Sequence, residues 1–147
     1  MPQMDLTTFF SKLEHAFQMS EFDSVADHFV LPSAVYIGDN VIVLNDRAKL
    51  LTVLKHQCKL NYSIGVRNVR HKVVGQSLSR KNNYWARVVW SHYDEDDLLH
   101  STFDARYFCR DDSFGIPQIQ LVEFMTTPAC YSWQDVVLLS ERRQAMV

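Results

Sequence analysis

His71 is the side chain in this sequence best suited to proton chemistry, and it lies in an alternating stretch. In VRNVRHKVVGQ, residues 66–76, Val69, His71 and Val73 share one face of a predicted strand, which makes that face apolar. An imidazole, with an ordinary pKa of about 6.5, exchanges a proton at neutral pH and can serve as a general base. The pattern leaves open the alternative of a core histidine bonded to one backbone carbonyl or to a water.

Asp104 is the second candidate for chemistry, and the direction in which it faces is ambiguous. In STFDARYF the more apolar face holds Phe103, Ala105 and Tyr107, which by alternation alone places Asp104 outside. If Asp104 faces inward, it must be hydrogen-bonded, paired with a cation or protonated, because an isolated buried carboxylate is costly. His71 would then be a suitable partner.

The stretch YWARVVWSHYD, residues 84–94, predicts a strand with two contrasting faces. The face that holds Arg87 is expected to point outward, so that Val88, Trp90 and His92 point into the protein. Trp90 can be a core residue or a platform for a ligand. His92 lies close to an acidic loop and can be pocket-lining or solvated.

The outward face of this strand also carries large groups: Trp85, Val89 and Tyr93. A monomer would leave this band in water, so we expect a homodimer through the outer face of the sheet. Scattered surface aromatics, which need no explanation, are the alternative.

No metal site and no cofactor site is predicted. The acidic run Asp94–Asp97 falls on a hairpin loop, where consecutive side chains point in different directions and are solvated. His15, His28 and His56 lie on predicted helices without a second ligand four residues later, so no HExxH-like zinc signature exists. Phosphate-binding glycine motifs are also missing.

Composition limits the remaining possibilities for domain number, partners and cellular compartment. A chain of 147 residues, 47% of them hydrophobic, suits one domain. The net charge of -2 and the pI near 6.3 argue against a nucleic acid or an anionic membrane as partner. Cys58, Cys109 and Cys130 are odd in number and widely separated, which indicates reduced thiols in a cytoplasmic protein. Neither a secretion signal nor an apolar run of about 18–20 residues is visible.

The elements that must position these side chains change in type along the chain. Apolar residues at helical spacing predict helices over 5–19, 21–29 and 47–60, with Pro32 ending the second and a short hairpin around Gly38 before the third. Alternating patterns then predict strands over 64–79, 84–94, 98–110 and 116–126. This order predicts one α+β domain over 1–128, in which three helices pack in the concave face of a strongly curved, mostly antiparallel sheet. Residues 129–147 form a C-terminal tail, with a helix predicted after Ser132.

The chain resembles the nuclear transport factor 2-like superfamily, which includes ketosteroid isomerase, scytalone dehydratase and the polyketide cyclase SnoaL. The resemblance covers about residues 5–127 and rests on the element order, on SEFDSVADHFVLPSAVYIGDN, and on YWARVVW and FDARYFCRDD. It implies a cystatin-like cone with a largely apolar pocket and frequent homodimers. Its members include enzymes and proteins without chemistry, so the fold alone does not choose a function.

The catalytic residues of these relatives carry over only in part. The three positions used by ketosteroid isomerase fall at Leu13, Ile37 and Asp104, of which two are hydrocarbon, so that mechanism is not expected here. Scytalone dehydratase and SnoaL resemble this chain more closely in placing an imidazole on the strand after the third helix, where RHKVVG has His71.

The resulting expectation is a protein that holds a small apolar molecule in its cone. It would be a cofactor-free isomerase, dehydratase or cyclase with His71 as base and Asp104 as partner. Alternatively, it would be a non-catalytic binding or assembly subunit, resembling the small subunit of ring-hydroxylating dioxygenases. The residues expected to line the pocket are Leu13, Phe17, Ile37, Leu54, Val88, Trp90 and His92.

Overall fold

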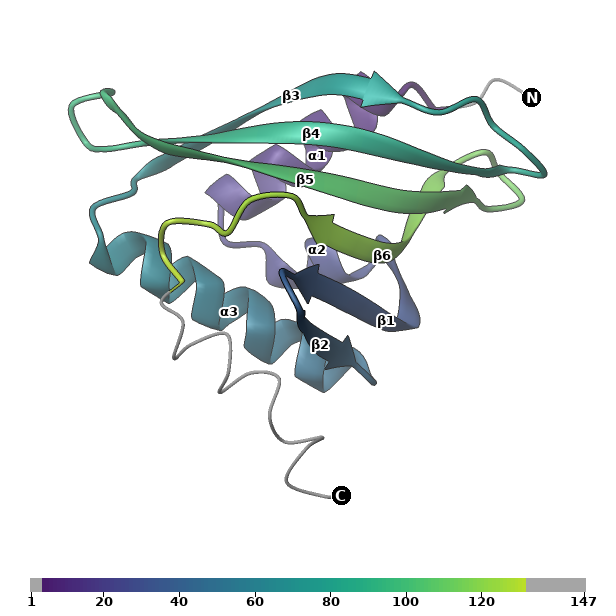
Figure 1. The fold of residues 1–147 in the computed structure, drawn as a ribbon, viewed down its shortest axis with the longest axis horizontal. Coiled ribbons are helices and arrows are strands. Elements are labelled where there is room, and N and C mark those ends of the chain that lie inside the picture. Colours follow the sequence, from purple (N-terminus) through teal and green to yellow (C-terminus); the bar gives the residue numbers. More distant parts are fainter. Residues whose placement is uncertain (1–3, 132–147) are drawn as a thin grey trace.

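The computed structural model describes residues 4–131, which form three helices and one six-stranded sheet (Figure 1). The helices are α1 (Leu6–Gln18), α2 (Phe22–Ala26) and α3 (Arg47–Ser63). The strands are β1 (Phe29–Ile37), β2 (Asn40–Leu44), β3 (Asn68–Gln76), β4 (Asn83–Tyr93), β5 (Leu99–Asp111) and β6 (Pro117–Phe124).

Both long helices begin at an aspartate that caps free backbone N–H groups. The Asp5 carboxylate accepts from the backbone N of Thr7 at 3.3 Å, and that of Asp46 accepts from the backbone N of Lys49 at 2.9 Å. Each helix then buries one apolar stripe against the sheet: Phe9, Phe10, Leu13 and Ala16 on α1, and Leu50, Val53 and Leu54 on α3.

The strands are arranged in the order β2-β1-β6-β5-β4-β3, so β2 and β3 form the two edges of the sheet. All neighbouring pairs are antiparallel except β1 and β6, which are parallel. Along β4 and β5, buried residues alternate with more exposed ones, which gives the sheet one inner and one outer face.

The helices lie on the inner side of this curved sheet. In Figure 1, α1 passes behind the long strands β3, β4 and β5, whereas α3 runs beside the short hairpin of β1 and β2. The segment that follows β6 leaves the sheet and reaches α3 (Figure 1). None of the helices within residues 4–131 has the length and apolar character required to cross a bilayer.

The predicted fold class is confirmed: helices on one face of a curved, mostly antiparallel sheet. The prediction for Pro32 was wrong. The second helix already ends at Ala26, and Pro32 lies inside β1, between Phe29 and Ala34, where the pairing with β6 is irregular. A residue without an N–H can be accommodated at such a break in the ladder. The helix predicted after Ser132 lies outside the described residues.

Candidate functional site

A cavity of about 270 Å³ lies between the inner face of the sheet and helices α1 and α3, and most of its lining side chains are apolar. Among the residues expected to line a pocket, Leu13, Phe17, Leu54, Trp90 and His92 do line it. Ile37 and Val88 are buried, with 3% and 0% exposure, but they do not line it.

Val88 belongs to the packed core of the protein. It lies in the same core cluster as Phe10 of α1, whose ring is 5.0 Å from that of Tyr107 on β5. Ile37 is the last residue of β1, beside the hairpin turn, and its side chain belongs to the same core.

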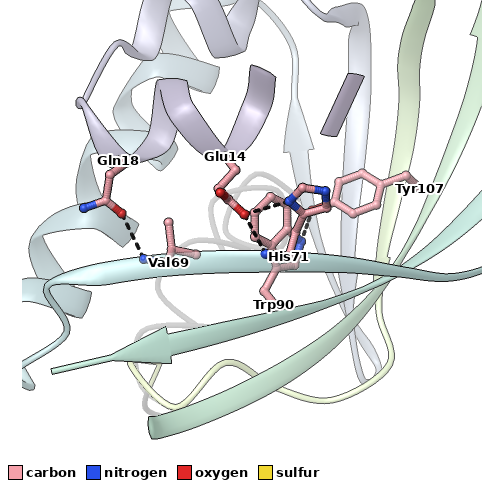
Figure 2. Close-up of polar contacts among 6 residues, drawn as sticks. All are labelled: Glu14, Gln18, Val69, His71, Trp90 and Tyr107. Atoms are coloured by element: carbon pink, nitrogen blue, oxygen red, sulfur yellow. Dashed lines mark hydrogen bonds and ion pairs between the residues drawn. The ribbon is translucent and has the colours of Figure 1, made fainter. Parts of the chain in front are cut away.

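His71 faces inward, as its strand pattern predicts, but it does not line the cavity. A single carboxylate oxygen of Glu14, on α1, accepts from both the backbone N and the ring Nδ1 of His71 (Figure 2). The ring also lies 5.8 Å from that of Trp90. The imidazole is therefore held in the contact between α1 and β3, away from the space that a ligand can occupy.

Asp104 lies on the outer face, and the predicted His71–Asp104 pair is wrong. The Asp104 carboxylate accepts from Nε of Arg87, with both oxygens at 3.0 Å, and it sits opposite Val89 on the neighbouring strand. Its neighbours Phe103 and Ala105 are buried on the inner face, so the alternation of β5 turns Asp104 outward. On the outer face, Arg87 provides the hydrogen-bond donors that the Asp104 carboxylate requires.

His92 is the titratable side chain of β4 that lines the cavity, and only 3% of it is exposed. Its Nδ1 has no hydrogen-bond partner within residues 4–131. Burial, with a smaller contribution from the positive charge of His100, lowers the pKa of His92 to about 4. The imidazole is therefore neutral at pH 7, so it can give and accept hydrogen bonds but is a weak base.

Other polar groups of the cavity bind one another. The indole Nε1 of Trp90 donates to the hydroxyl of Tyr107 at 2.8 Å (Figure 2), and burial raises the pKa of Tyr107. The hydroxyl of Tyr131 donates to Oε1 of Gln57 on α3 at 3.3 Å, which ties the segment after β6 to that helix. These contacts stabilise the walls rather than prepare a proton transfer.

The acidic run of the β4–β5 loop forms a turn. Oδ1 of Asp94 accepts from the backbone N of Asp96 at 2.9 Å and from that of Leu98 at 3.0 Å. Within residues 4–131, no three His, Cys, Asp or Glu side chains gather in a way that could hold a metal ion.

Two features of this site could not have been found by inspecting single strands. Glu14 is separated from His71 by 57 positions in the chain, and the sequence offers only its place beside the apolar stripe of α1 as a signal. Arg67, which also lines the cavity, precedes β3 and carries no motif.

Comparison with known proteins agrees with this architecture. A family model described as NTF2-like protein (DUF6841) matches residues 3–126. No curated protein matches the chain.

Solved structures with the same fold are numerous but distant in sequence. An NTF-2 like protein of unknown function from Shewanella oneidensis MR-1 is 10% identical, with a TM-score of 0.64 over 81% of this chain and 94% of that chain. A protein of unknown function with a cystatin-like fold from Nostoc punctiforme is 11% identical, with a TM-score of 0.63 over 88% and 97%.

A ketosteroid isomerase-like protein from Erwinia carotovora atroseptica is 10% identical, with a TM-score of 0.56 over 82% and 94%. At such identities the structural likeness shows the fold alone. The family match is the stronger finding, because it spans most of the chain: this protein belongs to the NTF2-like family DUF6841.

Proposed function

We propose that this protein binds a small, largely apolar molecule inside its cone, without acid–base catalysis by His71 and Asp104. The observation that carries this proposal is the cavity of about 270 Å³ with mostly apolar walls. That volume lies just below the range of about 300–1,000 Å³ that holds drug-sized ligands. At roughly 30 Å³ for each water it equals about nine water molecules, so a ligand of about ten non-hydrogen atoms suits it.

The arrangement of titratable groups supports binding over turnover. The two residues expected to form a catalytic pair lie on opposite faces of the sheet, each with its own partner. His92 lines the cavity, but with a pKa of about 4 it is too weakly basic to be an efficient general base near neutral pH. Binding without turnover, the alternative raised from the sequence, is therefore the function we adopt.

We extend the proposal to a homodimer through the outer face of the sheet, in the cytoplasm. Trp85, Val89 and Tyr93 are half-buried on that face, and no other described element covers it. The face carries both signs of charge, in Arg87 with Asp104 and in Arg106 with Glu123, so a second copy related by a two-fold axis can complement it. The separated cysteines support the location, as argued from the sequence.

The binding proposal is tested with octan-1-ol, a probe of suitable size, in a calorimetric or NMR titration. Val53→Phe places a larger side chain in the cavity wall, and Val74→Phe makes the same change on an exposed part of β3. We expect the wild type and Val74→Phe to bind the probe and Val53→Phe to bind it at least tenfold more weakly.

Native mass spectrometry of the purified protein is the second measurement, since a copurified molecule would reveal the natural ligand. Absence of both probe binding and a copurified molecule would overturn the proposal. Equal binding by Val53→Phe and Val74→Phe would show that the probe binds outside the cavity, which would also overturn the proposal.

A further inference from the structure

Arg67 lies where α3 gives way to β3, and its guanidinium is fixed on one side. Nη1 donates to the backbone carbonyls of Tyr62 at 2.9 Å and of Val66 at 3.0 Å. The guanidinium carbon lies 3.7 Å from the centroid of the Tyr62 ring. These contacts define both the position and the plane of the group.

The opposite edge of the same guanidinium is not used by the protein. Within residues 4–131, Nε and Nη2 of Arg67 donate no hydrogen bond, and no carboxylate lies within ion-pair distance. Capping of the Tyr62 carbonyl, in the last turn of α3, would explain one hydrogen bond of Nη1, but it leaves the Nε–Nη2 edge without a partner among residues 4–131. Two parallel N–H groups at such an edge match the two oxygens of a carboxylate.

The charges around the cavity favour an anion at this edge. Among the described residues that line it, Arg67 is the one arginine or lysine, and none is an aspartate or glutamate. Asp97, on the β4–β5 loop, accepts from Nδ2 of Asn68 at 3.4 Å and is not paired with Arg67. A cationic ligand would meet repulsion here, whereas an anionic one would meet a fixed donor in the wall of a mostly apolar space.

We propose that the ligand is a small apolar carboxylic acid, with its hydrocarbon part in the cavity and its carboxylate on the Nε–Nη2 edge of Arg67. This inference rests on the proposed function, because it names the class of molecule that the same cavity takes. One arginine neutralises the single charge of a carboxylate, whereas a phosphate dianion would require a second positive charge, which no other described lining residue carries as an arginine or lysine.

The test compares three probes with the same eight-carbon chain: octanoate, octan-1-ol and octan-1-amine, titrated into the protein at pH 7. We expect the wild type to bind octanoate at least about tenfold more tightly than octan-1-ol, as a charge-assisted hydrogen-bonded pair allows, and octan-1-amine most weakly. Arg67→Gln should remove the preference for octanoate while the affinity for octan-1-ol changes less than about twofold.

Two matched variants separate the contribution of the planar, fork-shaped guanidinium from that of its positive charge. Arg67→Lys keeps the charge without the planar fork and should lie between the wild type and Arg67→Gln. Arg70→Gln removes the same charge from the outer face, where the guanidinium of Arg70 lies 4.9 Å from the centroid of the Tyr93 ring, and should leave the preference for octanoate intact. An equal loss in Arg70→Gln would show an effect of net charge and would overturn the inference.

The failures of the two proposals are distinguishable. Binding of octan-1-ol with no preference for octanoate would overturn carboxylate binding by Arg67 but would still support a ligand in the cavity. Binding of none of the probes would overturn the inference, and together with the absence of a copurified molecule it would overturn the cavity function as well. If Arg67→Gln does not fold, the wild type still provides the test: the Nε–H resonance of Arg67 should shift on addition of octanoate and not of octan-1-ol. An unshifted resonance in saturating octanoate would overturn the inference.

Discussion

One carboxylate oxygen of Glu14 accepts two hydrogen bonds from His71, one from the backbone N–H and one from ring Nδ1, both at 2.7 Å. An ionised carboxylate can only accept, so Nδ1 must carry a hydrogen. An imidazole on the apolar side of β3 therefore has a structural explanation: it fixes the strand to α1. The side chain of His71 is only 9% exposed, so without Glu14 its Nδ1–H group would have no water to donate to either.

Glu14→Leu should lower the free energy of unfolding by about 2–4 kcal/mol, because it leaves two buried donors of His71 without an acceptor. Glu14→Gln is the matched control, since its amide oxygen can still accept from the backbone, and should cost no more than about 1 kcal/mol. Urea unfolding measures both values. Equal losses in the two variants would contradict this role of Glu14.

Stability should fall as the pH decreases from about 6.5 to about 4, with a contribution from His92 of about 3 kcal/mol at the lower end. The unfolded chain takes up a proton near pH 6.5, whereas the folded protein resists protonation of His92 down to about 4, so acid favours the unfolded state. The pKa of His28 is also lowered by burial and adds in the same direction.

His92→Phe should make the acid side of this profile flatter, because the phenyl ring cannot be protonated and retains the packing against Phe103. His15→Phe, at a side chain that is 72% exposed, is the control and should leave the slope unchanged. Chemical denaturation at a series of pH values provides the measurement. Parallel profiles for the wild type and His92→Phe would refute the assignment of the acid-side loss of stability to His92.

Asp104→Asn should lower the free energy of unfolding by about 1–3 kcal/mol, because the Asp104 side chain is only 16% exposed and its carboxylate accepts charge-assisted hydrogen bonds from Arg87. It should also leave the affinity for octan-1-ol unchanged, since the sheet separates Asp104 from the cavity. Urea unfolding and a probe titration test the two statements. A loss of probe binding greater than about tenfold would restore Asp104 to the site.

Sedimentation at micromolar concentration should show about twice the chain mass of 17.2 kDa if the outer face joins two copies. Val89→Asp should shift the protein toward the monomer, because an interface would then bury a charge next to Asp104. Leu78→Asp, at a side chain that is 93% exposed, is the control for added charge and should remain dimeric. A monomeric wild type would end the dimer proposal.

The fold could be predicted because its information is local. Alternation along β4 and β5 and the apolar stripe of α1 appear within single elements, and each indicates which side faces the core. The same alternation predicts Asp104 on the outside, whereas its match to a catalytic position of ketosteroid isomerase favours the inside. A pattern of burial was a better guide to that residue than a distant resemblance.

The site could not be predicted to the same extent, because its contacts join distant parts of the chain. The hydrogen bonds between Glu14 and His71 depend on how α1 lies across β3, which no spacing in the sequence specifies. The free edge of Arg67 depends on the carbonyls that hold its other edge. Such relationships arise from packing and become visible only when the elements are assembled.

The contact of α1 with β3 has a consequence for the edge of the sheet. Oε1 of Glu14 accepts from the backbone N of His71, and Oε1 of Gln18 accepts from that of Val69 at 2.9 Å. Four helical residues rise about 6 Å and two strand residues about 6.6 Å, so the two repeats nearly coincide over this distance. The helix thus offers acceptors at the interval at which a neighbouring strand would.

The helix and the strand match over one repeat only, because the difference between their rises accumulates along the chain. In addition, the residue one helical repeat before Glu14 is the apolar Phe10, which offers no acceptor. Over that repeat, however, the outward N–H groups of β3 are already occupied, so a strand from another molecule cannot pair with them while α1 is in place. The side chains of one helix thereby set the width of the sheet at six strands on this side.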